Sequence, residues 1–325
     1  MMLIERPFIL LLLAFLLLHP CILHLSESSS NFTDQLALIA FKSKISFGPN
    51  NTAFAAGNWS TTTNFCEWFG VSCSRRRQRV TALNLSYVGL HGTISPHIAN
   101  LSFLVSLDLK NNTFYGFLPH EISHLHRLRE LQLSNNLLEG NIPPTIHNCQ
   151  KLEYLYLSGN ELSGGIPKDL GMLPMLRELD LSMNPLMGAI PSSLSNISSL
   201  ESLNLESNSL TGPFPNVIFN ISSLINIFIS SNHISGTLPM ELCSHCPNLQ
   251  GLYLSDNQLG GHLPSQIHYC RDLVAISLSY NKFVGSIPKV IGSLEKLEIL
   301  YLGGNNLTGN IPPTVGNLSR LQQLW

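Results

Sequence analysis

The residues of this chain that are most able to bind a metal or to form cross-links are its cysteines, and three of them lie near histidines. Cys243 and Cys246 enclose a Ser-His pair, and His268 precedes Cys270 by two positions. Thiolate and imidazole at such spacing can bind zinc, and the same thiols can form a disulfide, Cys243 with Cys246 or Cys246 with Cys270. Because nothing in the spacing fixes a tetrahedral arrangement, we expect a structural role and no metal or other cofactor.

The sequence lacks the motifs of common catalytic machineries. It has no GxxxxGKS/T loop for phosphate, no GxSxG turn for a nucleophile and no Asp-Phe-Gly of a protein kinase. Charged residues make up 12% of the chain and the formal net charge is -2, which gives no reason to expect nucleic acid as a partner. We therefore expect a binding protein and no enzymatic activity in this chain.

One pattern recurs along the chain: LxxLxLxxN, followed by xLxGxIP. Two successive copies read LRELQLSNNLLEGNIP and LEYLYLSGNELSGGIP. The Asn position recurs every 24 residues, except for one step of 25 between Asn232 and Asn257. Such a register is the signature of a repeat architecture. The Asn position is occupied, in order, by Val88, Asn112, Asn136, Asn160, Asn184, Asn208, Asn232, Asn257, Asn281 and Asn305.

The period predicts what each position does. In the xLxLx part the leucines point inward and their neighbours outward, as on a strand. We expect an α/β-type leucine-rich-repeat solenoid, a right-handed superhelix with a parallel β-sheet on its concave face and short 3-10 or irregular segments on its convex face. The Asn residues should form a buried ladder that bonds backbone groups of their own turn and of the next. The Gly permits an unusual backbone shape, and the Pro ends that segment.

The repeats also place three cysteines. Cys149, Cys246 and Cys270 lie three residues before the first Leu of a repeat, where other repeats carry Leu or Ile. This column faces the core, so we interpret each as a buried thiol that packs as a small hydrophobic residue.

Outward-facing strand residues are the candidates for ligand binding. Aromatic rings beside carboxylates suit an extended peptide that carries Lys or Arg. The alternative is that Tyr and Phe are present because they favour strands. Two neighbouring outward arginines are absent, which argues against capture of a free carboxylate by these repeats. The candidates are Glu130, Tyr154, Tyr156, Glu178, Asp180, Asn204, Phe228, Tyr253 and Tyr301.

The start of the chain has the features of a secretory signal peptide, which we place at residues 1–30. Arg6 precedes an apolar run from Phe8 to Leu18, which is too short for the ~20 residues that span a bilayer. Export makes N-glycosylation plausible at Asn-x-Ser/Thr triplets. These triplets begin at Asn31, Asn50, Asn58, Asn84, Asn100, Asn111, Asn196, Asn220, Asn306 and Asn317.

Residues 31–78 form the expected N-terminal cap, and residues 79–325 hold about ten 24-residue repeats with a truncated eleventh. A solenoid needs such a cover because its terminal repeat cannot bury its own apolar face. We expect a cap helix from Asp34 to Ile45, with Thr33 as its N-cap and an apolar face formed by Leu36, Ile39, Ala40 and Phe41. The run Arg75, Arg76, Arg77 and Arg79 is expected to be an exposed, solvated edge.

The cap run DQLALIAFK, the later NWS and CEWFGVSC, and the LxGxIP repeats together resemble the ectodomain of plant leucine-rich-repeat receptor-like kinases. The phrases RRRQRVTALNLS, IFNISSL and YLGGNNLTGNIPPTVGNLSRLQ resemble one branch, which contains receptors for bacterial flagellin and elongation factor and the rice blight-resistance receptor. The resemblance implies a disulfide between Cys66 and Cys73, which fits an oxidising exported compartment. It also implies binding of a peptide or microbial elicitor, followed by pairing with a co-receptor kinase.

The sequence therefore predicts the extracellular ligand-recognition module of a plant immune receptor-like kinase. The parent receptor would lie in the plasma membrane, and its co-receptor surface would lie in C-terminal repeats beyond this chain. Two alternatives stay open: a secreted inhibitor of microbial polygalacturonase, and a truncated decoy receptor that does not signal.

Overall fold

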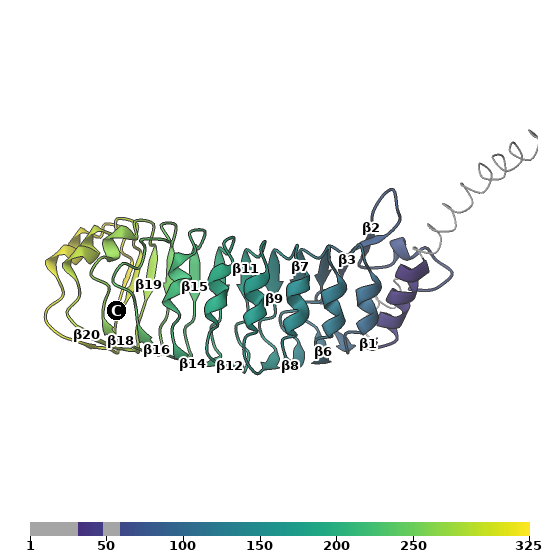
Figure 1. Cartoon of the computed structure of the whole chain (residues 1–325), viewed down its shortest axis with the longest axis horizontal. Coiled ribbons are helices and arrows are strands. Elements are labelled where there is room, and N and C mark those ends of the chain that lie inside the picture. The colour runs from purple at the N-terminus through teal and green to yellow at the C-terminus, as the bar shows by residue number, and fades with distance from the viewer. Residues whose placement is uncertain (1–31, 48–58) are drawn as a thin grey trace, which may run out of the picture.

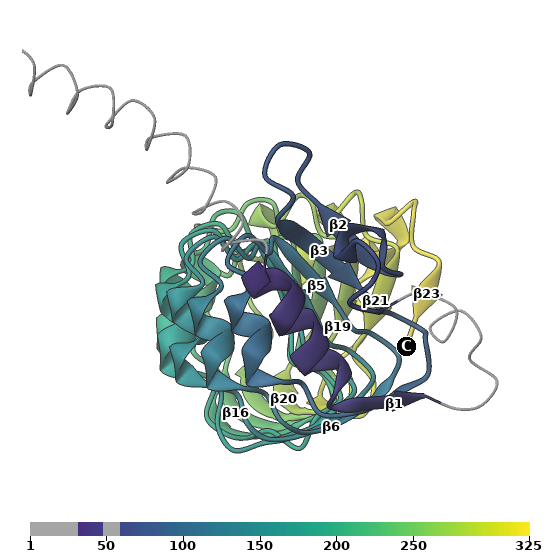
Figure 2. The ribbon, with the colours of Figure 1, turned by 90° about the vertical axis from the view of Figure 1, so that its right-hand side faces the viewer.

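The computed structural model describes residues 32–47 and 59–325, which form a curved stack of coils (Figure 1). The expected signal peptide and the triplets at Asn31, Asn50 and Asn58 lie outside these residues. Seen along the stack, most coils have a 3-10 segment on one side, a strand of a long sheet on another, and a strand of a second set on a third (Figure 2). One apolar interior runs between these sides through all the coils.

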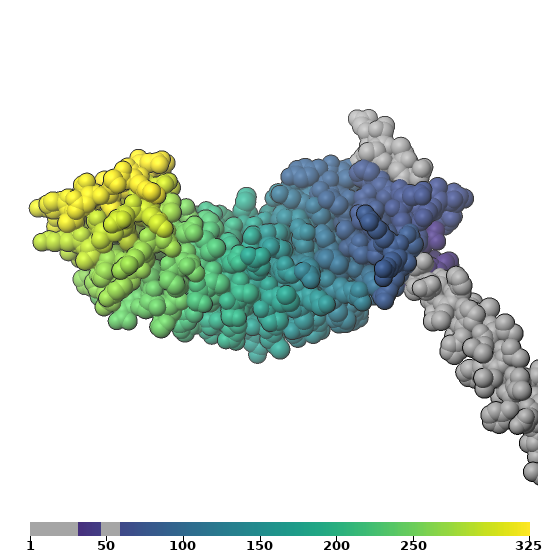
Figure 3. Space-filling view, turned by 90° about the horizontal axis from the view of Figure 1, so that it is seen from above, coloured from purple at the N-terminus to yellow at the C-terminus, as the bar shows by residue number. Residues whose placement is uncertain are grey.

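The long sheet has twelve strands in chain order and confirms the predicted parallel arrangement. From β3 onward each strand pairs in parallel with the next, and only β2 and β3 are antiparallel. The coils stack in an arc (Figure 3). The 3-10 segments lie in front of the long sheet in Figure 1, and the view from above in Figure 3 is hollowed on the opposite side, so the long sheet lies on the inner side of the arc. The strands are β2 (Val71–Cys73), β3 (Val80–Asn84), β5 (Ser106–Asp108), β7 (Glu130–Gln132), β9 (Tyr154–Tyr156), β11 (Glu178–Asp180), β13 (Ser202–Asn204), β15 (Asn226–Phe228), β17 (Gly251–Tyr253), β19 (Ala275–Ser277), β21 (Ile299–Tyr301) and β23 (Gln323–Leu324).

Two further sheets, which the sequence reasoning did not predict, run along the side of the arc. Their strands contain the xLxGx part of each repeat, whose glycines from Gly116 to Gly309 have φ between +73° and +95°, a region that other residues rarely adopt. The first contains β1 (Ile45–Phe47), β4 (Leu90–Gly92), β6 (Thr113–Phe117), β8 (Leu137–Asn141) and β10 (Glu161–Ser163). The second contains β12 (Met187–Gly188), β14 (Ser209–Pro213), β16 (His233–Thr237), β18 (Gln258–His262), β20 (Lys282–Gly285) and β22 (Asn306–Leu307).

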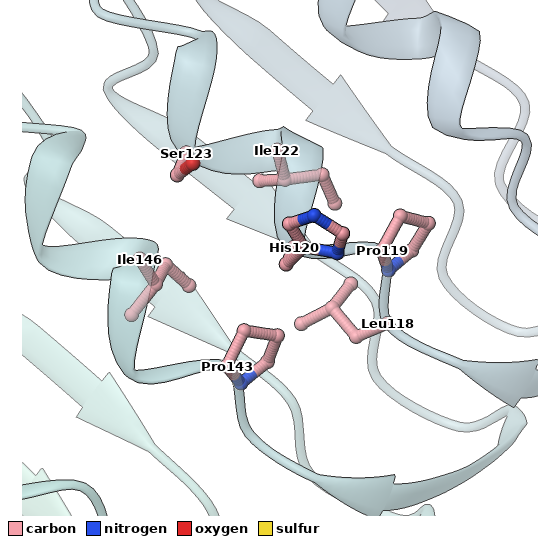
Figure 4. Close-up of a pocket in the computed structure, with 7 residues that line it drawn as sticks. All are labelled: Leu118, Pro119, His120, Ile122, Ser123, Pro143 and Ile146. Atoms are coloured by element: carbon pink, nitrogen blue, oxygen red, sulfur yellow. The ribbon is translucent and has the colours of Figure 1, made fainter.

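The outer side of the arc carries 3-10 segments, as predicted. In most coils the Pro of the xIP element precedes the segment, because its fixed φ and missing N–H suit a first turn. The gap between two such segments, η3 and η4, is a shallow apolar notch lined by residues such as Leu118, Ile122 and Ile146 (Figure 4). The segments are η1 (Phe65–Glu67) in the cap and then η2 (Pro96–Asn100), η3 (His120–His124), η4 (Pro144–Asn148), η5 (Lys168–Met172), η6 (Ser192–Asn196), η7 (Asn216–Asn220), η8 (Ile267–Tyr269), η9 (Lys289–Ser293) and η10 (Pro313–Asn317).

The Asn residues of the repeats form a ladder inside the turn that follows each strand of the long sheet. The Asn160 side-chain amide donates to the carbonyl oxygens of Leu157, Ser158 and Leu133, at 3.0–3.2 Å. Its Oδ1 accepts from the backbone N–H of Leu138, at 3.0 Å. Leu133 and Leu138 belong to the preceding coil. We had expected the ladder to reach the next coil, so the predicted direction was wrong: the side chain bonds its own turn and the coil before it. Each Asn therefore ties two coils together.

The cap helix spans residues 32–42 and includes Thr33, so its start differs from the expected Asp34 and Thr33 is not its N-cap. The predicted apolar face is also wrong in part, since Leu36 is 47% exposed whereas Ala37, Leu38 and Phe41 are buried. The reason is an ion pair. The fully buried carboxylate of Asp34 accepts two hydrogen bonds from the Arg79 guanidinium, at 2.8 and 2.9 Å, and thereby turns the helix.

Two disulfides lie in the described residues. Cys66 and Cys73 are joined at the base of the cap, with their Cα atoms 5.5 Å apart. Cys243 is joined to Cys270, with a Cα separation of 5.0 Å, so neither pairing considered from the sequence is present and Cys270 is not a free thiol. Cys246 is free and buried, as is Cys149. Cys243 and Cys246 both lie in the coil that contains the one-residue insertion, and Cys243 is the one bonded to the neighbouring coil.

Candidate functional site

The nine candidate residues lie on the inner side of the arc, and each is half-buried. Eight of them occupy consecutive strands from β7 to β17 and therefore form one continuous surface. In the parallel register Tyr154 lies between Glu130 and Glu178, and Asp180 pairs with Tyr156. The sheet thus brings together side chains that are more than 120 residues apart in the chain, from Glu130 to Tyr253.

An aromatic pair occupies β9. The rings of Tyr154 and Tyr156 stack with centroids 6.2 Å apart and an interplanar angle of 18°. The Tyr156 hydroxyl donates to the Glu178 carboxylate at 2.7 Å. Burial is the main cause that raises the pKa of Tyr156, and the bond to Glu178 raises it further, because loss of the phenolic proton would place two negative charges side by side. Tyr156 is therefore a neutral donor that holds Glu178 in place.

A second aromatic pair lies three strands further along the sheet. Phe228 on β15 and Tyr253 on β17 stack with centroids 4.8 Å apart and an interplanar angle of 12°. Burial raises the pKa of Tyr253. At ~4.8 Å per strand, the step from β9 to β15 is about 14 Å. The two pairs therefore bracket a central strip that carries Glu178 and Asp180, and we call this whole surface the aromatic–acidic patch.

Two of the predicted site residues make local hydrogen bonds. Asp180 Oδ1 accepts from the backbone N–H and the hydroxyl of Ser182, at 3.0 and 2.6 Å, and Asn204 Oδ1 accepts from the N–H of Glu206 at 3.1 Å. This is the usual turn bond of Asp and Asn to a group two residues ahead. The side chains of Asp180 and Asn204 therefore stabilise the turns that follow their strands.

The sequence reasoning missed a row of charges at the edge of the patch, one residue before the strands. Arg177 forms an ion pair with Glu201 at 2.6 Å and also donates to the Tyr154 hydroxyl at 3.4 Å. The hydrogen bond to Glu201 is the largest cause that raises the pKa of Arg177. Arg129 pairs with Glu153 at 3.0 Å. The alternation of Arg and Glu at a 24-residue spacing was the signal that could have revealed this row.

Tyr301 lies apart from the other candidates. Ser277 on β19 separates it from Tyr253 in the register, and that serine is buried. The Tyr301 hydroxyl bonds the Gln323 side chain, and its ring packs edge-on against Trp325, with centroids 6.2 Å apart. Among the predicted residues, therefore, Tyr301 does not join the aromatic–acidic patch.

The described glycosylation triplets fall mostly on one edge. Asn100, Asn196, Asn220 and Asn317 are the exposed last residues of η2, η6, η7 and η10. The other described triplets begin at Asn84 on β3, at Asn306 on β22 and at Asn111 in a turn. Strands β5 to β21 of the inner sheet contain none of the triplets, so glycans at the described positions would leave the aromatic–acidic patch uncovered.

The cysteine–histidine cluster has no metal-site geometry. Within residues 32–47 and 59–325 no group of three His, Cys, Asp or Glu side chains is arranged to hold an ion. Burial raises the pKa of Cys149 to about 12 and that of Cys246 to about 11, which keeps both thiols protonated and unreactive. Among the described residues, no helix has the length and apolar character needed to cross a bilayer.

Three family models match the chain. A leucine-rich repeat region matches residues 72–262, a leucine-rich repeat N-terminal domain residues 32–74, and a further leucine-rich repeat residues 247–307. Among curated proteins, the receptor-like kinase EFR of Arabidopsis thaliana is 48% identical over 99 residues, which are 30% of this chain and 9% of EFR. The receptor kinase-like protein Xa21 of Oryza sativa subsp. japonica is 43% identical over 83 residues, 24% of this chain and 8% of Xa21. The aligned parts are thus less than a tenth of these relatives.

Solved structures show the same arc. The PEPR1–AtPEP1 structure aligns with 89% of this chain and 44% of that chain, with a TM-score of 0.78 and 32% identity. The Arabidopsis receptor kinase HAESA, in complex with the peptide hormone IDA and the co-receptor SERK1, aligns with 90% of this chain and 52% of that chain, with a TM-score of 0.72 and 30% identity. A plant ice-binding protein aligns with 90% of this chain and 94% of its own, with a TM-score of 0.75 and 28% identity.

The ice-binding structure shows that this fold by itself does not define a function. The repeat pattern and its cap nevertheless agree with all three comparisons: the family matches, the plant receptor kinases among the relatives, and the receptor ectodomains among the solved structures. The chain belongs to the leucine-rich repeat family. It has the fold of a plant receptor-kinase ectodomain and resembles the ectodomains of peptide-hormone receptors.

Proposed function

We propose that this chain is the ligand-binding part of a plant immune receptor-like kinase and that it binds an extended peptide along its inner sheet. The observation that carries the proposal is the aromatic–acidic patch, in which two stacked aromatic pairs bracket carboxylates. In the described residues no Lys or Arg forms an ion pair with Glu178 or Asp180. A cationic side chain of a peptide can therefore supply the missing positive charge.

The geometry favours a peptide over a small molecule. The rings lie on a broad open sheet and not in an enclosed pocket, and the bracketed strip is about 14 Å wide, the length of about four extended residues. Stacked rings supply rigid contact area at small entropic cost, which is why aromatic residues dominate binding hot spots. A Lys or Arg placed between the pairs can contact the Glu178 carboxylate and an aromatic face together.

The peptide complexes of PEPR1 and HAESA support this class of ligand, because those structures are 32% and 30% identical to this chain over most of its length. The HAESA structure also contains a co-receptor kinase. We infer that the parent protein pairs with a co-receptor after the peptide is bound.

The test is a titration of the secreted chain with synthetic peptides from microbes and from plants, each compared with a version in which Lys and Arg are replaced by Gln. We expect Tyr156→Ala, Phe228→Ala and Tyr253→Ala each to weaken binding of the active peptide at least tenfold, as for hot-spot residues (about 1.4 kcal/mol or more). Tyr115→Ala is the matched control, because this tyrosine is 44% exposed on the side sheet. Unchanged affinity in all three variants would place the ligand elsewhere.

A further inference from the structure

A second charged region lies at the cap end of the molecule, apart from the aromatic–acidic patch. Arg75, Arg76 and Arg77 occupy the loop between β2 and β3, which projects from the body of the arc (Figures 1 and 2). All three are exposed. Arg127, an exposed residue between η3 and β7, joins them from 50 positions further along the chain.

Two of these arginines, Arg77 and Arg127, converge with Arg79 on one aromatic ring. The guanidinium carbon of Arg127 lies 3.9 Å from the centroid of the half-buried Phe103, that of Arg79 lies 4.5 Å away and that of Arg77 lies 5.5 Å away. A ring face attracts cations through its quadrupole, which explains how like charges can share it. The sequence alone suggested a solvated edge here, because nothing in it showed that Phe103 and Arg127 reach the Arg75–Arg77 loop.

Only one of the three guanidinium groups is neutralised. Arg79 is buried, forms the ion pair with Asp34 and donates to the Ser102 hydroxyl at 2.9 Å. For Arg77 and Arg127, and for Arg75 and Arg76, no ion pair is present within the part of the chain that the structure describes. The acids close to this region in the sequence are Glu67, which is exposed, Asp108, Glu121, whose carboxylate lies 3.4 Å from His120, and Glu130, whose carboxylate accepts from the Ser106 hydroxyl. Within the described residues none of them pairs with the four exposed arginines, whose charge therefore remains available to a ligand.

The loop that carries this charge has a fixed base. The disulfide between Cys66 and Cys73 holds one strand of the hairpin to the cap. The backbone N–H of Ser74 donates to the carbonyl of Arg79 at 2.9 Å, and that of Gln78 donates to the carbonyl of Ser74 at 3.0 Å. Because the backbone is already ordered, a ligand has to fix only the side chains.

We propose that Arg77 and Arg127, which lie over Phe103, act together with Arg75 and Arg76 of the same exposed loop to bind a linear polyuronate, a polysaccharide that carries one carboxylate on each sugar. Guanidinium groups match carboxylates in a two-bond geometry, and the Phe103 ring holds two of these groups close together. A single exposed ion pair contributes little to binding, so a surface without a pocket needs a ligand that repeats its charge.

Other polyanions fit less well. An exported chain does not meet the anionic cytoplasmic leaflet of the membrane, and it does not meet nucleic acid in the cell. An acidic peptide has the charge, but its flexible backbone and side chains lose more conformational freedom on binding than a stiff sugar polymer does. The polyuronate surface is separate from the aromatic–acidic patch, so this proposal does not depend on the proposed peptide function.

The experiment compares binding of the secreted chain to unesterified polygalacturonate with binding to the fully methyl-esterified polymer, which has the same backbone without charge. We expect binding to the unesterified polymer alone and a steady loss of affinity as salt is raised. The variant R75Q/R76Q/R77Q/R127Q should bind at least tenfold more weakly. R271Q/R320Q, which removes two exposed arginines from distant coils, should bind as the unchanged chain does.

The proposal also predicts a role for the ring, so Phe103→Ala should weaken binding to polygalacturonate by several-fold although no charge is removed. Thermal unfolding of each variant checks that the cap is intact, and Arg79 is kept for that reason. Equal binding to the esterified polymer, or an unaffected quadruple variant, would overturn the proposal. Poly-glutamate that binds as tightly as polygalacturonate would assign the surface to acidic peptides instead.

Discussion

The two sides of the twelve-stranded sheet follow different rules. On the inward side the same residue types recur in nearly every coil, and Leu131, Leu155 and Leu179 are all essentially buried. On the outward side the residues in register with one another change from coil to coil, as in the series Gln132, Tyr156 and Asp180. An interior shared between coils tolerates little change in volume, whereas each outward residue meets only its neighbours and solvent. The repeated side therefore carries stability, and the varied side is where we propose that recognition occurs.

The largest effect is expected in the coil that contains the one-residue insertion, where a buried disulfide joins it to the neighbouring coil. We expect removal of the disulfide by Cys243→Ala with Cys270→Ala to destabilise the protein by about 3.6 kcal/mol, from the entropy of a loop of 27 residues. Replacing Cys66 and Cys73, which are 7 residues apart, by Ala should lower the free energy of unfolding by about 2.4 kcal/mol. Denaturant unfolding measures both losses, and hydrogen exchange should locate the first in the coils around β17 and β19.

The control for this prediction is Cys246→Ala, which leaves both disulfides in place. If it destabilised the protein as much as the double substitution, the cross-link would not be what holds this coil.

The Asn ladder gives the next effect. Asn160→Ala leaves four hydrogen bonds unmade, and we expect a loss of ~1–3 kcal/mol, the cost of unpaired buried backbone groups. Asn148→Ala, at the exposed end of η4, should change the free energy of unfolding by less than about 0.5 kcal/mol. Equal losses in urea unfolding would mean that the ladder has no special role.

A substitution in the turn just before the ladder Asn should have a smaller effect and should stabilise the protein. Met183 has φ of +54° and is 63% exposed, and the equivalent Gly159 has φ of +63°. Left-handed backbone costs a non-glycine residue roughly 1–2 kcal/mol, part of which glycine loses again in entropy. We therefore expect Met183→Gly to raise the free energy of unfolding by up to ~1 kcal/mol.

Met172→Gly is the matched control, because this exposed methionine ends η5. It should lower the stability instead. A lower melting temperature for Met183→Gly would show that the Met183 side chain makes contacts worth more than the backbone strain.

The smallest effect belongs to the outward side. The pKa of Tyr156 is raised in the folded chain, mainly by burial, so the stability from this group is fully present below the unfolded value of about 10 and is lost as pH rises above it. Tyr156→Phe should therefore reduce the loss of stability above pH ~10 and lower stability at neutral pH by roughly 0.5 kcal/mol, because the hydrogen bond to Glu178 is lost. Urea unfolding measures the second effect. The difference between the phenolate absorbance titrations of the two proteins gives the titration of Tyr156, and a midpoint near the ordinary value of about 10 would contradict the shift.

The sequence predicted those parts of the molecule that depend on its period. The inward leucines, the buried Asn residues and the parallel strands all follow from a 24-residue register, because alternation along a strand decides which side chains face the core. The outward residues of the aromatic–acidic patch could be named for the same reason. The cap was harder, because its helix does not repeat, and the buried Asp34 was not recognisable as the partner of Arg79.

Other features were decided only by the tertiary structure, because they join positions that no local pattern relates. The side sheets arise when xLxGx segments of neighbouring coils pair, and the Cys243–Cys270 bridge depends on how one inserted residue is absorbed. The Arg75–Arg77 loop meets Phe103 and Arg127 only once the coils have stacked. A repeat sequence determines the shape of each coil and its inward side, but contacts between non-equivalent positions follow from how the coils are placed in space.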